Sequence, residues 1–364
     1  MAKKQEHHGY AKTIALSFVL TSAVAGGVIY AMGSSSLFSE QFVQTFRPPV
    51  LDKALYDQKL NQLAHIVIST STATTTPGLA TSTAQVASST PTLWPVKTVY
   101  PRVGALLPFN RIVAYYGNFY SKAMGALGEY EPDTMLSMLM AEVEKWKLAD
   151  PTTPVIPALN YIAATAQGSA GEDGMYRLRM PDEHIQKAID LANRVNGIVF
   201  LEVQIGLSTV AEEVAVLDKY LALPNVHLAL DPEFAMKTKK RPGSVIGSMD
   251  ASEINWALDH LSKIVQERNL PPKILIVHRF TEKMVTNYKS ILPTPETQVI
   301  VVMDGWGTAE LKERVYEHII TDEPVQFTGI KLFYKNDLKS PSTGLMPTSR
   351  VLKLMPSPSY IQYQ

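Results

Sequence analysis

Residues 197–206 read GIVFLEVQIG and residues 226–234 read VHLALDPEF, and these two stretches decide the fold. Each is a short apolar run that ends in polar or charged side chains. Strands that are apolar on both faces are typical of a parallel sheet covered by helices. Alternation along the first stretch places Phe200, Glu202 and Gln204 on one face and uniformly apolar residues on the other.

Similar apolar runs occur at six other places in the last two-thirds of the chain. They are IVAYYGN (112–118), VIPALNY (155–161), KILIVHRF (273–280), VIVVMDG (299–305), TGIKLFY (328–334) and YIQYQ (360–364). Segments of helical length separate most of them, so the pattern predicts a single (β/α)8 TIM barrel of the α/β class. We assign residues 98–364 to this barrel and expect its active site at the carboxyl ends of the strands.

The sequence of residues 1–97 predicts export and a membrane anchor. Basic residues precede the uncharged apolar run IALSFVLTSAVAGGVIYAM at 14–32, which approaches the ~20 residues that cross a bilayer as a helix. We expect residues 1–13 to be cytoplasmic, 14–32 to be a transmembrane signal anchor and the remainder to be extracytoplasmic. Secretion after signal cleavage is the alternative. Residues 33–68 are assigned to a stalk and 69–97, rich in Ser and Thr, to a disordered linker.

The composition excludes several functional classes. Lys and Arg number 34 and Asp and Glu also number 34, so no overall charge favours nucleic acid as a partner. The chain has no cysteine, which excludes disulfides, thiolate nucleophiles and zinc–thiolate sites. Neither a dinucleotide-binding fingerprint nor a phosphate-binding loop is present, and no histidine spacing supports zinc. We therefore expect no cofactor and no bound metal.

Four carboxylates lie at or just beyond the predicted strand ends and are the candidate catalytic residues. They are Glu202, Asp231, Glu233 and Asp304. Glycoside hydrolysis needs two such groups in one pocket, one a proton donor with a raised pKa and the other an ionised base or nucleophile. We expect Asp231 or Glu233 to be the acid and Glu202 or Asp304 to be the base.

Polar and aromatic side chains near the same ends complete the expected site by positioning a sugar ring. The substrate-binding candidates are Tyr116, Asn118, Asn160, Gln204, His278, Trp306 and Lys331. The aromatic side chains expected near the rim are Tyr115, Tyr116, Tyr176, Phe234, Phe280 and Trp306. The long segment 163–180 after the second strand is expected to form a lid or a substrate wall.

Each candidate also has a structural interpretation. A carboxylate at a strand end often pairs with a basic neighbour, here Lys331 or Arg279. Asp304 could instead cap the turn at Gly305 or the helix beyond it. His278 is a candidate acid, base or metal ligand, although a single histidine at a strand end is more often a hydrogen-bonded core residue.

The motifs YYGN, FLEVQ, LALDPEF, IVHRFT, MDGWGT and GIKLFY, followed by TGLM, resemble an uncharacterised family of exported bacterial proteins. The resemblance spans about residues 111–363 and implies a glycosidase-like TIM-barrel fold, with no particular reaction attached. The chain lacks the alternating aspartates that chitinase-type barrels carry on strand four. It also has Lys331 on strand seven, where many retaining barrels place a nucleophilic glutamate.

Together these features predict a membrane-tethered, extracytoplasmic barrel that acts on or binds a cell-envelope polysaccharide or another glycan, in the manner of a glycoside hydrolase. A non-catalytic glycan-binding or scaffold barrel is the first alternative. It would be favoured if each carboxylate were locked to Lys331, Arg279 or Arg177. A metal-dependent hydrolase is the second, and it requires three ligands that converge near His278.

Overall fold

A computed structural model describes residues 50–66, 93–237 and 239–364 of the chain. The expected cytoplasmic segment and membrane anchor, with most of the expected linker, lie outside these residues. Within the described ranges, no helix is both long enough and apolar enough to cross a bilayer.

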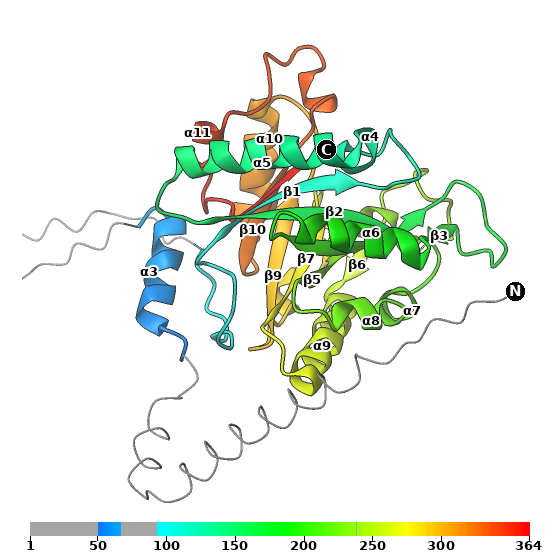
Figure 1. The fold of residues 1–364 in the computed structure, drawn as a ribbon, viewed down its shortest axis with the longest axis horizontal. Helices are drawn as coiled ribbons and strands as arrows, with labels where there is room; N and C mark the ends of the chain where they lie inside the picture. The colour runs from blue at the N-terminus through cyan, green and yellow to red at the C-terminus, as the bar shows by residue number, and fades with distance from the viewer. Residues whose placement is uncertain (1–49, 67–92, 238) are drawn as a thin grey trace, which may run out of the picture. The chain divides into compact units, whose positions relative to one another are not determined.

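Eight parallel strands form a closed barrel (Figure 1). The strands are β1 (Arg111–Gly117), β2 (Val155–Ala166), β4 (Ile198–Val203), β5 (Val226–Leu230), β7 (Lys273–Arg279), β9 (Thr297–Met303), β10 (Phe327–Leu332) and β11 (Tyr360–Tyr363). Strand β1 pairs in parallel with both β2 and β11, and this double pairing closes the sheet. The predicted TIM-barrel fold is therefore confirmed, with each of the eight strands in its expected place.

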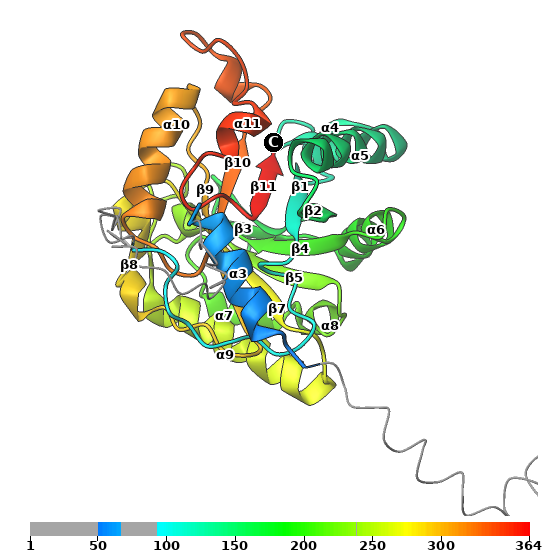
Figure 2. The same cartoon turned by 90° about the vertical axis from the view of Figure 1, so that its left-hand side faces the viewer.

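Helices cover the outside of the barrel (Figures 1 and 2). They are α4 (Ala126–Glu129), α5 (Pro132–Ala149), α6 (Asp182–Asn193), α7 (Val210–Ala215), α8 (Asp218–Leu221), α9 (Ala251–Arg268), α10 (Ala309–Tyr316) and α11 (Thr348–Val351). Helix α9 begins with a capping box in which Asp250 and Glu253 bond each other's backbone N–H groups, as suits a well-defined helix start. A π-helical turn, Glu317–Thr321, directly continues α10.

Strand alternation separates two apolar layers. Phe200 and Ala229 belong to the layer inside the barrel, whereas Val199 and Leu201 belong to the layer between sheet and helices. This is the facing that alternation along the sequence predicts for β4. Tyr115 lies in the outer layer, so the expectation that it contributes to the rim is wrong. The next residue on the strand, Tyr116, faces inward and lines the cavity.

Helix α3 (Lys53–Leu63) closes the amino-terminal end of the barrel (Figure 2). Its Tyr56 is buried in the inner layer, with its ring centroid 6.0 Å from that of Phe109 in an edge-on arrangement. The Ser357 N–H donates to the Leu63 carbonyl at 2.8 Å, which ties the end of the helix to the segment before β11. The compact unit therefore begins at Leu51, earlier than the boundary at residue 98 that composition favours, and includes part of the expected stalk.

Candidate active site

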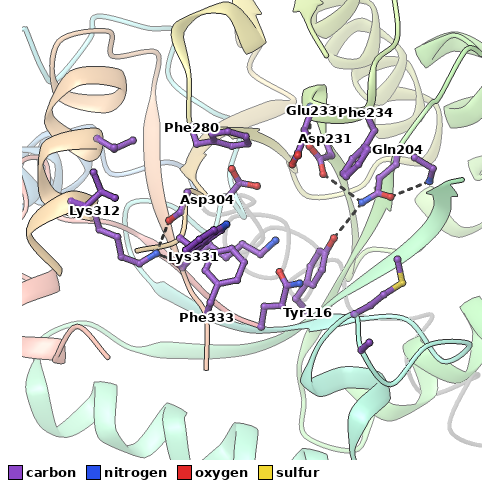
Figure 3. A pocket seen from close by; sticks show the side chains of 18 residues that line it. Tyr116, Gln204, Asp231, Glu233, Phe234, Phe280, Asp304, Lys312, Lys331 and Phe333 are labelled. Atoms are coloured by element: carbon purple, nitrogen blue, oxygen red, sulfur yellow. Dashed lines mark hydrogen bonds between the residues drawn. The ribbon is translucent and has the colours of Figure 1, made fainter. Parts of the chain in front are cut away.

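A cavity of about 700 Å³ opens at the carboxyl ends of the barrel strands (Figure 3). Most of its polar lining comes from five strands or the turns that follow them: Tyr116, Gln204, Asp231, Glu233, Asp304 and Lys331. Lys312 of α10 and Gln364 after β11 complete it. Its apolar lining comes mainly from the loops and helices beyond: Met124, Phe234, Phe280, Trp306, Leu311, Val315 and Phe333. This combination of a few convergent polar groups and an apolar wall is typical of a small-molecule or saccharide site.

Glu202 lies fully buried below the floor of the cavity. One carboxylate oxygen accepts hydrogen bonds from Tyr116 Oη at 2.9 Å and from Gln204 Nε2 at 3.3 Å. The other accepts from Asn160 Nδ2 at 2.7 Å and lies 3.0 Å from His278 Nε2. Glu202 is therefore the centre of a hydrogen-bond network and does not line the cavity.

The surroundings of Glu202 favour its ionised form. Burial alone would raise the pKa of Glu202, because a charge is costly in the protein interior. The neighbouring His278 and Lys331 outweigh burial, with help from the Tyr116 hydroxyl, so the pKa lies below its usual value. A carboxylate of this kind orients its four donors and is a positioning group.

Asp231 is adjacent to this network but lines the cavity. Its Oδ1 accepts a hydrogen bond from the Glu233 N–H at 3.0 Å, which fixes the turn after β5. Its Oδ2 lies 3.4 Å from Gln204 Nε2 (Figure 3). The same amide nitrogen donates to Glu202, so it bridges the two carboxyl groups. Burial, and then the charges of Glu202 and Asp304, raise the pKa of Asp231 well above its usual value. Its surroundings therefore favour the protonated form of Asp231, which suits a proton donor.

Asp304 is the second cavity carboxylate that is joined to the network. It follows β9, while Asp231 follows β5, and β7 with His278 lies between these two strands. Asp304 Oδ2 is 3.4 Å from His278 Nδ1, and the other ring nitrogen of His278 faces Glu202. The helix beyond is capped by Thr308, so the alternative that Asp304 is its cap is wrong.

Glu233 lies at the mouth of the same cavity and is half-buried. Burial, with the nearby charge of Asp304, raises its pKa to about 6. Glu233 thus loses its proton near neutrality, in a range where a shift of one pH unit changes the charge of the cavity.

A buried ion pair supports the rim next to Trp306. Lys312 Nζ lies 3.1 Å from Asp337 and donates to the carbonyl of Gly305 at 2.7 Å. Asp337 also accepts from the N–H groups of Gly307 at 2.9 Å and Phe333 at 2.9 Å. Sequence reasoning missed this pair because Lys312 and Asp337 lie in two separate connections between strands, and no local pattern relates them.

The long segment 163–180 contributes only Ala166 to the lining of the cavity. Strand β2 runs to Ala166 and pairs with the short antiparallel strand β3 (Arg177–Arg179). The buried Glu213 of α7 accepts from Arg177 Nε at 2.8 Å and from Arg179 Nε at 2.8 Å, which fixes this hairpin to the next unit. The expected loop is therefore largely an anchored hairpin.

Seven of the predicted site residues line the cavity: Tyr116, Gln204, Asp231, Glu233, Asp304, Trp306 and Lys331. Glu202, Asn160 and His278 lie together beneath its floor. Asn118 lies elsewhere, because its side chain donates to the Ile162 carbonyl at 2.9 Å and accepts from the Tyr120 N–H at 2.8 Å. Gln362 on β11 was missed, although alternation on that strand points it inward with Tyr360; its Oε1 accepts from Asn160 at 3.2 Å.

Ligand sets for metals are also absent from the part of the chain that the structure describes. There, no group of three His, Asp or Glu side chains is arranged to hold a metal ion. His278 has two carboxylate neighbours, Glu202 and Asp304, but the first is fully occupied by hydrogen bonds.

No protein-family model matches the chain, and no curated protein sequence matches it. Among solved structures, a ruminal GH26 endo-β-1,4-mannanase is 10% identical, with 70% of this chain and 58% of that chain covered and a TM-score of 0.34. A GH5 glycoside hydrolase from Prevotella bryantii is 11% identical over 61% of this chain and 78% of its own, with a TM-score of 0.30. The HPPK-DHPS protein of Plasmodium falciparum is 8% identical over 70% and 44%, with a TM-score of 0.32.

The chain spans less than two-thirds of the ruminal mannanase. At these identities and TM-scores, the similarities say nothing of the reaction or substrate. The barrel that the sequence resemblance implied is confirmed by the strand pairing, while membership of the exported bacterial family stays a prediction.

Proposed function

We propose that this protein is a glycoside hydrolase that binds and cleaves a glycan in the barrel cavity. The observation that carries the proposal is the pair Asp231 and Asp304, which reach the cavity from strand ends on either side of β7 and have different surroundings. The raised pKa of Asp231 suits the proton donor. Asp304, next to His278, suits the base or nucleophile.

In this mechanism Asp231 donates its proton to the glycosidic oxygen as the bond to the anomeric carbon breaks. Asp304 either removes a proton from the attacking water or attacks the anomeric carbon itself, after which water releases the sugar. Glu202 takes no direct part, because it lies below the floor. It positions Tyr116, Gln204 and His278 through hydrogen bonds of 2.9–3.3 Å.

The non-catalytic alternative is not favoured by the ion pairs. Arg279 pairs with Glu323, and Arg177 pairs with Asp173 and Glu213, all outside the cavity. Within the described ranges, Lys331 makes no ion pair with any carboxylate. The carboxyl groups of Asp231 and Asp304 thus keep one side toward the cavity.

The proposal is tested by incubating the full-length protein with peptidoglycan and with soluble plant and bacterial polysaccharides, and measuring the new reducing ends. Asp231→Asn and Asp304→Asn are the matched inactive variants, since each keeps the size of the side chain. Release of reducing ends that both variants lose supports the proposal. Binding of a glycan without any release would instead identify the scaffold alternative, and release that survives both substitutions would place the chemistry elsewhere.

Trp306 provides a binding test that is independent of cleavage. Its side chain is 55% exposed at the rim and lines the cavity, where its ring face suits an apolar sugar face. We expect Trp306→Ala to weaken glycan binding by about 1–2 kcal/mol, or roughly five- to thirtyfold in Kd. Calorimetric titration measures this change. Trp256→Ala is the control, because Trp256 is also exposed but does not line the cavity; equal losses in both variants would argue against a rim platform.

We also propose that residues 14–32 anchor the protein and place the barrel outside the cytoplasm. The support is the basic segment followed by an uncharged apolar run. Membrane fractionation with protease digestion of intact cells tests the topology. Recovery of the barrel from the medium, with a new amino terminus near residue 33, would favour the secreted alternative.

A further inference from the structure

Lys331 is a buried cation that points into the cavity (Figure 3). It lies on β10, and only 5% of the residue is exposed. Its ammonium nitrogen is 3.8 Å from the ring centroid of Tyr116 and 5.1 Å from that of Phe333. These two rings stabilise the charge from the side through cation–π interactions.

The other buried cations of the described residues have protein acceptors. Arg111 pairs with Asp150, Arg279 with Glu323 and Lys312 with Asp337. Lys273 donates to backbone carbonyls, including that of Val226 at 2.8 Å.

Lys331 differs, because its Nζ has neither a hydrogen-bond acceptor nor an ion-pair partner within the residues that the structure describes. An ammonium group has three N–H donors, and burying it is costly unless these are used. Aromatic faces attract the charge but do not replace strong acceptors. The donors of Lys331 are therefore left for whatever enters the cavity.

Titratable and charged groups from several elements surround Lys331. Its charge interacts with those of Glu202, Asp231, Glu233 and Lys312, and its ammonium group lies over the Tyr116 ring. Asp304 lines the same cavity, and His278 lies between Asp304 and Glu202. Glu202 is an ionised neighbour of Lys331, and the pKa of Asp231 is raised, which favours its uncharged form. Neither carboxyl group accepts a hydrogen bond from the Lys331 ammonium, because the bonds of Glu202 come from Tyr116, Asn160, Gln204 and His278.

We propose that Lys331 forms a subsite for a carboxylate group, so that the glycan bound in this cavity contains an acidic sugar. This inference rests on the proposed glycan-binding function. The carboxylate would accept charge-assisted hydrogen bonds from the Lys331 ammonium beside Tyr116.

Binding of an acidic sugar carries a pH signature. Glu233 and Asp304 also face the cavity, and their negative charges oppose a ligand carboxylate. The pKa of Glu233 is about 6, so Glu233 is mostly protonated at pH 5 and mostly charged at pH 7. Since a sugar carboxylate stays largely ionised at pH 5, acidic sugars should bind more tightly there than at pH 7, while neutral sugars should change less.

Matched sugars that differ by an acidic group test the proposal with the full-length protein. Suitable pairs are glucuronic acid with glucose, galacturonic acid with galactose and N-acetylmuramic acid with N-acetylglucosamine, each titrated by saturation-transfer NMR at pH 5 and pH 7. We expect the wild type to prefer at least one acidic partner by about tenfold or more, the equivalent of one charge-assisted hydrogen bond.

Lys331→Met should remove this preference, lowering the affinity for the acidic partner more than that for the neutral one, whereas Lys331→Arg should keep part of the preference. Lys289→Met is the matched control, because Lys289 is exposed and does not line the cavity. Thermal melting shows whether each variant is folded. If Lys331→Met is not folded, the preference of Lys331→Arg is measured in its place.

Equal binding of acidic and neutral partners by the wild type overturns the carboxylate subsite but leaves the glycan site in place. A preference that survives in Lys331→Met also overturns it. Failure of every sugar to bind removes the proposed glycan function as well.

Discussion

Replacing Asp231 by asparagine is expected to lower kcat/KM for glycan cleavage by about 10²–10⁴-fold, the usual contribution of a general acid. The reason is that the raised pKa of Asp231 favours its protonated form, and an asparagine amide cannot act as an acid toward a leaving oxygen. Reducing-end release measured from pH 4 to 9 should also lose its basic limb in the variant, because that limb reports ionisation of the acid.

Stability provides the control for Asp231→Asn. Asparagine retains the Oδ1 that accepts from the Glu233 N–H, so the turn after β5 should be kept. A carboxyl group whose pKa is raised by folding stabilises the protein below its unfolded pKa of about 3.9, and this contribution is lost as pH rises toward the folded pKa. Asparagine does not ionise, so the variant should be at least as stable as the wild type at pH 8. The free energies of unfolding of the two proteins should differ less near pH 4.

Glu233→Gln separates the two candidate acids. Glu233 lies at the mouth and has a pKa of about 6, so its removal should affect the rate less than removal of Asp231. If Asp231→Asn were folded and fully active while Glu233→Gln were inactive, Glu233 would be the proton donor and Asp231 would not.

The position of the site around the barrel could be predicted because parallel strands follow two simple rules. Each strand is an apolar run with a polar end, and every second residue faces inward. These rules place Gln204, Asp231, Asp304 and Lys331 at one end of the barrel, and all four line the cavity.

Depth within the barrel could not be predicted in the same way. Glu202 and Gln204 share a face of β4, so alternation treats them alike. Two residues of strand nevertheless advance by about 7 Å, which is the difference between a side chain at the cavity surface and one beneath its floor. Helix α3 was missed as part of the barrel unit for a related reason: its contact through Tyr56 with Phe109 depends on long-range packing that no local pattern encodes.

Replacing the buried Glu202 by alanine is expected to destabilise the fold by about 3–5 kcal/mol, as for other buried charged groups whose partner is removed. The substitution leaves donors of Tyr116, Asn160, Gln204 and His278 without their acceptor. Glu202→Gln should cost less, because one carbonyl oxygen remains. Urea denaturation at pH 7 measures the free energy of unfolding of both variants. Glu172→Gln is the control, because Glu172 is exposed and its replacement should change the stability little.

The pH dependence identifies the charge of Glu202 as the cause. Although burial alone would raise it, the folded pKa of Glu202 lies below the unfolded value because of His278 and Lys331. The contribution of Glu202 is therefore present above the unfolded pKa of about 4.3 and is lost as pH falls through the folded value. The difference between wild type and Glu202→Ala should be largest at neutral pH and should narrow in acid. A difference that stays constant with pH would mean that Glu202 stabilises the barrel by packing, and that the network below the cavity floor does not depend on its charge.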